Sequence, residues 1–146
     1  MRPPPGADRP PGALPPPFDD PRYAEGVALF QGEEFVEAHE ALELAWRAAP
    51  AGPDKRFLQG LIQLAVSLEH WRRGNPRGAR GQWEKARAKL DDLPPIHGGL
   101  ALGELLAGFR DWYAPYDLDA AVALQAAGRW AHPADDRPRP LPRWAG

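Results

Sequence analysis

Prolines are concentrated at the two ends of the chain, and this placement limits where regular structure can form. Eight of the nineteen prolines lie in residues 1–17, and four more lie in residues 133–142. Because proline fixes φ and lacks a backbone N–H, neither end can form a helix or a central strand. We therefore expect a disordered or extended Pro-rich flank at residues 1–17, one folded domain at residues 18–128, and a Pro- and Arg-rich tail at residues 129–146.

Between the two ends, apolar residues recur with the spacing of helices. The pattern predicts helices at about residues 21–31, 33–49, 54–73, 75–92, 101–113 and, more weakly, 117–127. Short connectors favour antiparallel neighbours, and no alternating apolar pattern of useful length predicts a strand. The expected fold class is all-α, a single bundle of five to six antiparallel helices.

Composition excludes several classes of protein. The formal net charge is −2, without the basic excess of a general nucleic-acid or membrane-surface binder. Cysteine is absent, which excludes disulfides and thiolate chemistry. The N-terminus lacks the apolar region of a secretory signal, and no run reaches the ~18 apolar residues of a membrane span. We therefore expect a soluble, cytoplasmic protein.

The helix predicted at residues 33–49 carries the most informative side chains. His39 shares one face with Leu42 and Trp46, and Glu43 lies one turn further along, at position i+4 from His39. A titratable imidazole on an apolar face must find a partner or cost stability. This helix therefore carries either a buried structural hydrogen bond or the beginning of a site.

The next helix carries polar residues along one line. Gln59, Gln63 and His70 occupy positions i, i+4 and i+11. Amides on an otherwise apolar central helix are costly unless they are hydrogen-bonded. In an antiparallel hairpin, residues equidistant from the connector face each other, so we predict that Gln63 reaches His39 or Glu43.

Two interpretations of this constellation stay open. In the first, which we favour, the protein is a structural or binding module without enzymatic activity, and a closed His39/Glu43/Gln63 network locks the two helices. In the second, it is a hydrolase that works with or without a divalent metal, with His39, Glu43 and Glu40 as the catalytic candidates. The chain lacks the His-Glu-x-x-His motif of zinc proteases, because Glu43 occupies the position of the second histidine.

Cofactors and partners are weakly specified by the sequence. We expect no cofactor, and His39, Glu43 and His70 are the candidate ligands of a divalent metal in the second interpretation. The residues identify no partner. A protein partner or a homodimer is compatible with them.

Three motifs together resemble a known family. Residues 29–46 read LFQGEEFVEAHEALELAW, residues 57–65 read FLQGLIQLA, and residues 73–76 read RGNP. In this order they are similar to the motifs of the "domain of unknown function 309" family, over about residues 22–95. The resemblance implies a small all-α domain from bacteria, archaea or plastids, and it implies no established activity.

The resemblance also singles out individual positions. The following residues match the family's motifs: His39, Glu40, Glu43, Trp46, Gln59, Gly60 and Gln63. The Pro-rich head and the tail lie outside the similar region, so the resemblance implies nothing about them.

Overall fold

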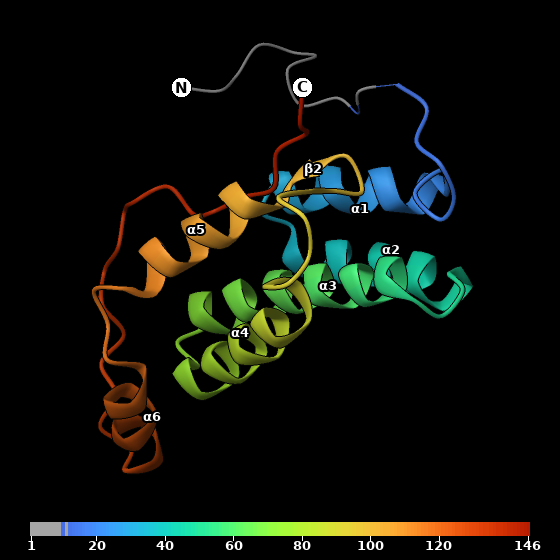
Figure 1. The fold of residues 1–146 in the computed structure, drawn as a ribbon. Coiled ribbons are helices and arrows are strands. Elements are labelled where there is room, and N and C mark those ends of the chain that lie inside the picture. Colours follow the sequence, from blue (N-terminus) through green and yellow to red (C-terminus); the bar gives the residue numbers. More distant parts are fainter. Residues whose placement is uncertain (1–9, 11) are drawn as a thin grey trace.

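The computed structural model describes residue 10 and residues 12–146, and this part of the chain folds into six helices and one short hairpin (Figure 1). The helices are α1 (Pro21–Gln31), α2 (Phe35–Ala48), α3 (Pro53–Arg72), α4 (Pro76–Leu90), α5 (Leu102–Tyr113) and α6 (Leu118–Ala126). The predicted all-α class is confirmed. Most of the predicted N-terminal flank, residues 1–9 and 11, lies outside the described residues.

Local sequence signals set where several helices begin. The Asp20 carboxylate accepts a hydrogen bond from the backbone N–H of Arg22 at 3.0 Å, and Asn75 caps α4 in the same way. A proline follows each of these caps, at the first helical position, where its missing N–H costs no hydrogen bond. These caps explain why the sequence predicts the starts of α1 and α4 so closely.

Helix α3 is the centre of the domain and packs against both α2 and α4. Ten of its twenty residues are buried, as expected for a helix that is apolar on most of its circumference. Gly60 brings α3 and α4 together, because a Cβ atom at this position would lie only 2.5 Å from Cδ2 of Leu90. The close approach of these two helices positions the site described below.

A short hairpin precedes α5 and was not predicted. Its strands are β1 (Ile96–His97) and β2 (Leu100–Ala101), and Gly98 and Gly99 form the turn with φ of 56° and 75°. Both values lie in the left-handed region, which glycine adopts without steric cost. Strands of two residues are too short to show an alternating pattern, so the sequence contains no signal for them.

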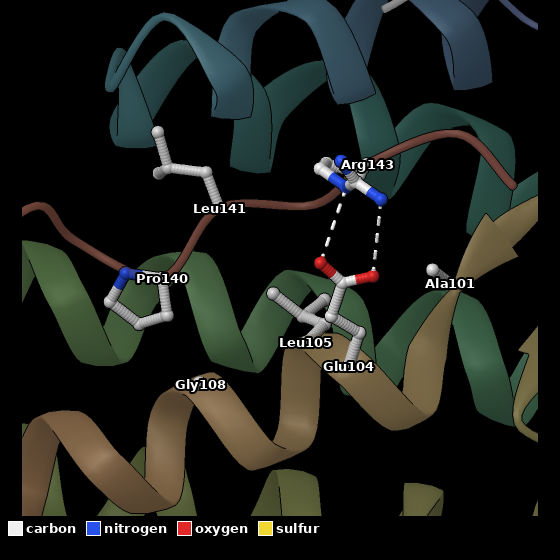
Figure 2. A pocket seen from close by; sticks show the side chains of 7 residues that line it. All are labelled: Ala101, Glu104, Leu105, Gly108, Pro140, Leu141 and Arg143. Carbon is white, nitrogen blue, oxygen red and sulfur yellow. Dashed lines mark hydrogen bonds and ion pairs between the residues drawn. The ribbon is translucent and has the colours of Figure 1, made fainter. Parts of the chain in front are cut away.

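The tail at residues 129–146 is extended, as predicted, but it packs along the domain (Figure 1). Trp144 pairs with Leu100 in an isolated β-bridge, and its side chain is buried in the core beside Tyr23. Figure 2 shows a small pocket of about 230 Å³ between the tail and α5, where Arg143 forms an ion pair with Glu104 at 3.3 Å. The core therefore includes a residue from a segment whose composition predicts a flank.

Within the described part of the chain, no helix combines the length and the apolar character that crossing a membrane requires.

Candidate functional site

A pocket of about 330 Å³ opens at the surface between α2, α3 and α4. Both polar and apolar side chains line it. The lining residues are His39, Glu43 and Trp46 from α2, Gln59, Ile62, Gln63 and Val66 from α3, and Gln82 from α4. The structure thus brings together the main residues that the sequence predicted for helices two and three.

The buried face of α2 decides where His39 points. Ala38, Leu42 and Ala45 are buried in the core, and they occupy positions i, i+4 and i+7 on one face. His39 follows Ala38 and is therefore rotated about 100° from it around the helix axis. Its side chain is 40% exposed and lies at the edge of the apolar face, in the pocket wall.

His39 and Glu43 interact along their own helix. The Nε2 atom of His39 lies 3.4 Å from Oε2 of Glu43, and Arg47 donates to Oε1 of Glu43 at 2.9 Å. Among the described residues, no hydrogen bond joins His39 or Glu43 to Gln63. The predicted closed network between the two helices is therefore not formed, because each partner of Glu43 is supplied by α2 itself.

Gln63 has an unsatisfied acceptor in the pocket. Its Oε1 atom is buried and has no hydrogen-bond partner within the described chain. A buried acceptor without a donor costs roughly 1–3 kcal/mol of stability relative to a satisfied one. Because Gln63 lines the pocket, rotation of its carboxamide would bring this acceptor to a ligand that carries an N–H or O–H group.

Gln82 is a pocket residue that the sequence reasoning missed. It precedes Trp83 in α4, whose buried seam includes Ala79, Trp83 and Ala86. A polar residue one position from a seam lies at its edge and faces the neighbouring helix, here α3. This adjacency is the signal that could have identified Gln82.

Two of the predicted candidates lie outside the pocket. Glu40 is exposed and does not line it, because its side chain is rotated away from that of His39. His70 lies at the α3–α4 connection, where its Nδ1 atom is 3.0 Å from the amide nitrogen of Asn75. Neither residue therefore completes the candidate catalytic group or the candidate metal site.

Metal coordination is poorly supported by this arrangement. In the part of the chain that the structure describes, no three His, Asp or Glu side chains come together as a potential metal site. A divalent ion at His39 and Glu43 would find two protein ligands, whereas catalytic zinc sites use three. The chemistry of the lining is that of hydrogen bonding, through an imidazole, a carboxylate and three carboxamides.

Trp46 and Gly60 have different roles although both match the family's motifs. The indole ring of Trp46 lines the pocket, and Nζ of Lys55 lies 5.0 Å from the centre of that ring. Gly60 faces Leu90 in the helix interface and does not line the pocket. Five of the seven motif positions therefore line the pocket. Gly60 contributes indirectly, because it allows the close approach of α3 and α4.

Comparisons with known proteins place part of this chain beside one family of domains. Residues 23–82 match the family model described as "Domain of unknown function (DUF309)". The matched segment extends from α1 into α4 and includes every residue that lines the pocket.

Two curated proteins are similar to part of this chain. The uncharacterized protein YpuF of Bacillus subtilis (strain 168) is 47% identical over 54 residues, which are 37% of this chain and 31% of YpuF. An uncharacterized protein of Aquifex aeolicus (strain VF5) is 31% identical over 74 residues, which are 51% of this chain and 22% of that protein. The similarity thus spans less than a third of either relative.

The names of these relatives assign no activity, so the hydrolase alternative gains no support from them. The resemblance predicted from the three motifs is confirmed by the family model. Residues 23–82 of this chain therefore match the DUF309 family model, as the three motifs predicted.

Proposed function

We propose that this protein is a binding module, and that the pocket between α2, α3 and α4 takes a small uncharged polar ligand. The observation that carries the proposal is that Gln63 lines an open pocket while its Oε1 atom is buried without a hydrogen-bond partner in the described chain. Folded proteins normally pair such an atom, so an unpaired one in a residue that lines a pocket calls for an explanation, and a bound ligand provides one.

The lining supports an uncharged ligand. Glu43 is its only carboxylate, and one of its oxygens already accepts from Arg47 at 2.9 Å. None of the described lysines and arginines lines the pocket, and Arg47 and Lys55 already interact with Glu43 and Trp46, so a phosphate or carboxylate ligand would lack free cationic donors. Carboxamides, by contrast, donate and accept hydrogen bonds without carrying charge.

Binding is favoured over hydrolysis by the composition of the same wall. It contains no Ser, Thr or Lys side chain that could act as a nucleophile. The carboxamides of the wall could stabilise a developing charge, but no such nucleophile accompanies them, and His39 and Glu43 contact each other. The pair is therefore better suited to orienting a ligand than to cleaving one.

NMR titration with a library of small uncharged polar fragments tests this proposal. We expect a subset of fragments to shift the indole N–H resonance of Trp46 and to leave that of Trp144, which is buried in the core far along the chain, unchanged. Gln63→Leu should abolish the response, whereas Glu40→Gln, on the exposed side of α2, should preserve it. A library without any hit at Trp46 would contradict the proposal.

A further inference from the structure

We infer that the ligand of this pocket is a nucleobase, free or as its nucleoside, bound through its hydrogen-bonding edge. The inference rests on the proposed function and adds the chemical class of the ligand. It follows from three properties of the lining: the number of carboxamides, the apolar surface between them and the absence of cations.

The carboxamides of the pocket determine which arrangement of hydrogen-bond donors and acceptors a ligand must carry. Gln59, Gln63 and Gln82 come from two helices and line one pocket, and within the described chain Oε1 of Gln63 has no hydrogen-bond partner. Each carboxamide presents an N–H donor beside a C=O acceptor. A ligand satisfies both at once only if it carries an acceptor and a donor on the same edge.

Nucleobases have such edges, and most other biological amides do not. Adenine presents an amino group beside a ring nitrogen, and a glutamine side chain can bind both atoms together. A trans peptide bond directs its N–H and C=O to opposite sides, so it cannot pair with one carboxamide in this way. The glutamines therefore discriminate against an extended peptide.

The two acceptors of the pocket add a requirement for donors. Oε1 of Gln63 is buried without a partner, and Oε2 of Glu43 has only His39 at 3.4 Å, which is long for a charge-assisted hydrogen bond. An exocyclic amino group or a ring N–H supplies the missing donor. Both occur on the edges of bases.

The apolar part of the lining fits a flat ring. Trp46, Ile62 and Val66 line the pocket together with the polar groups, and bases pack favourably against aromatic and aliphatic side chains. A volume of about 330 Å³ is small among ligand pockets and suits a single base. Because no lysine or arginine lines the pocket, the structure favours the nucleoside over the nucleotide.

Calorimetric titration of the full chain with methylated analogues tests the edge directly. The probes are adenosine and N6,N6-dimethyladenosine, uridine and 3-methyluridine, with glucose as an uncharged ligand that offers only hydroxyl groups. We expect at least one parent nucleoside to bind and its methylated analogue to bind about tenfold more weakly or worse. The 5′-monophosphate should not bind more tightly than the nucleoside.

Variants assign the binding to this pocket. Gln63→Leu should weaken binding of the nucleoside about tenfold or more, and Glu40→Gln, on α2 but outside the pocket, should leave the affinity unchanged. Equal binding of parent and methylated nucleosides, or equal binding by wild type and Gln63→Leu, would overturn the inference.

The outcomes separate this inference from the proposed function. If glucose or other uncharged fragments shift the Trp46 indole resonance and no nucleoside does so at millimolar concentration, the inference of a nucleobase ligand is wrong. The proposal that the protein is a binding module is then still supported. If no compound of either kind shifts that resonance, both proposals fail.

Discussion

The Nε2 atom of His39 lies 3.4 Å from Oε2 of Glu43, and the two side chains are 40% and 33% exposed. Both residues belong to α2, and Arg47 from the same helix binds the other carboxylate oxygen. The pair therefore forms part of an open wall and does not tie α2 to α3. The locking network of the first interpretation is therefore not formed, and the open pair leads to measurable differences in stability.

His39→Ala and Glu43→Ala should each lower the free energy of unfolding by only about 0.5 kcal/mol, as is typical of exposed i,i+4 pairs. A locking network would instead cost about 3 kcal/mol or more. Urea unfolding followed by circular dichroism measures the difference. Leu42→Ala, on the buried face of the same helix, is the control and should cost about 2–5 kcal/mol.

Gln63→Leu should stabilise the domain by about 1 kcal/mol, because it removes a buried acceptor that has no protein partner. Gln59→Leu is the matched control: its amide has no such buried atom, and the expected change is within about 0.5 kcal/mol. Chemical denaturation of the two variants measures both values. A variant that gains stability while losing ligand binding would mark Gln63 as a functional residue, whereas a loss of stability would revive the structural network.

Gly60→Ala should destabilise the domain by about 1–3 kcal/mol, because the new methyl group would meet Leu90 at 2.5 Å. Gly81→Ala provides the control within α4. A Cβ atom there has no neighbour within 4 Å, so the better helix propensity of alanine should add up to about 1 kcal/mol. Thermal unfolding should therefore shift in opposite directions, and the same direction for both would refute this account of the helix interface.

Trp144→Ala should cost about 3–5 kcal/mol, because the indole is 7% exposed and packs edge-on against Tyr23 at 5.9 Å. Its neighbour Arg143 supplies the contrast. The ion pair between Arg143 and Glu104 is exposed at both ends, so Arg143→Ala should change stability by less than about 1 kcal/mol. Similar, small effects for both variants would show that the tail does not contribute to the core in solution.

Acid should weaken the packing of the tail through Asp135. Hydrogen bonds from Arg137 and Tyr116 hold the pKa of this carboxyl well below its usual range. A pKa that is lower in the folded state contributes stability above the unfolded value of about 3.9, and this contribution is lost as the pH falls toward the folded pKa.

The test compares the free energy of unfolding at neutral pH with that below about pH 4. Asp135→Asn should lose less stability on acidification than the wild-type chain, because asparagine does not titrate. Asp136→Asn, at the exposed neighbouring position, should retain the wild-type dependence. If the free energy of unfolding of Asp135→Asn depends on pH as that of the wild type does, the contacts of Asp135 with Arg137 and Tyr116 do not stabilise the folded state.

The helices could be predicted from the sequence because the signals for the start and end of a helix lie in the residues next to those positions. Asp20 and Pro21 start α1, and Asn75 and Pro76 start α4, because capping and the geometry of proline act over a few residues. The short hairpin at residues 96–101 could not be predicted in this way. Its strands are stabilised by pairing with Trp144, more than forty positions further along the chain.

The candidate site was only partly accessible from the sequence. His39, Glu43 and Gln63 were correctly assigned to one region because the short connector makes their helices neighbours. Gln82 was missed, and the pairing of Gln63 with His39 or Glu43 was predicted but is not observed. Helical spacing predicts the direction of a side chain around the helix axis only to within tens of degrees. A difference of that size decides whether His39 and Glu43 meet Gln63 on the neighbouring helix or line an open pocket.

The sequence by itself determined the helices, their caps and order, the family motifs and the polar residues of the hairpin, because these depend on periodicity and on interactions between near neighbours. Tertiary structure alone decided that His39 and Glu43 face water, that Gln82 joins them, and that the Pro-rich tail contributes Trp144 to the core. These features depend on the rotation and separation of packed helices, here set by contacts such as Gly60 against Leu90.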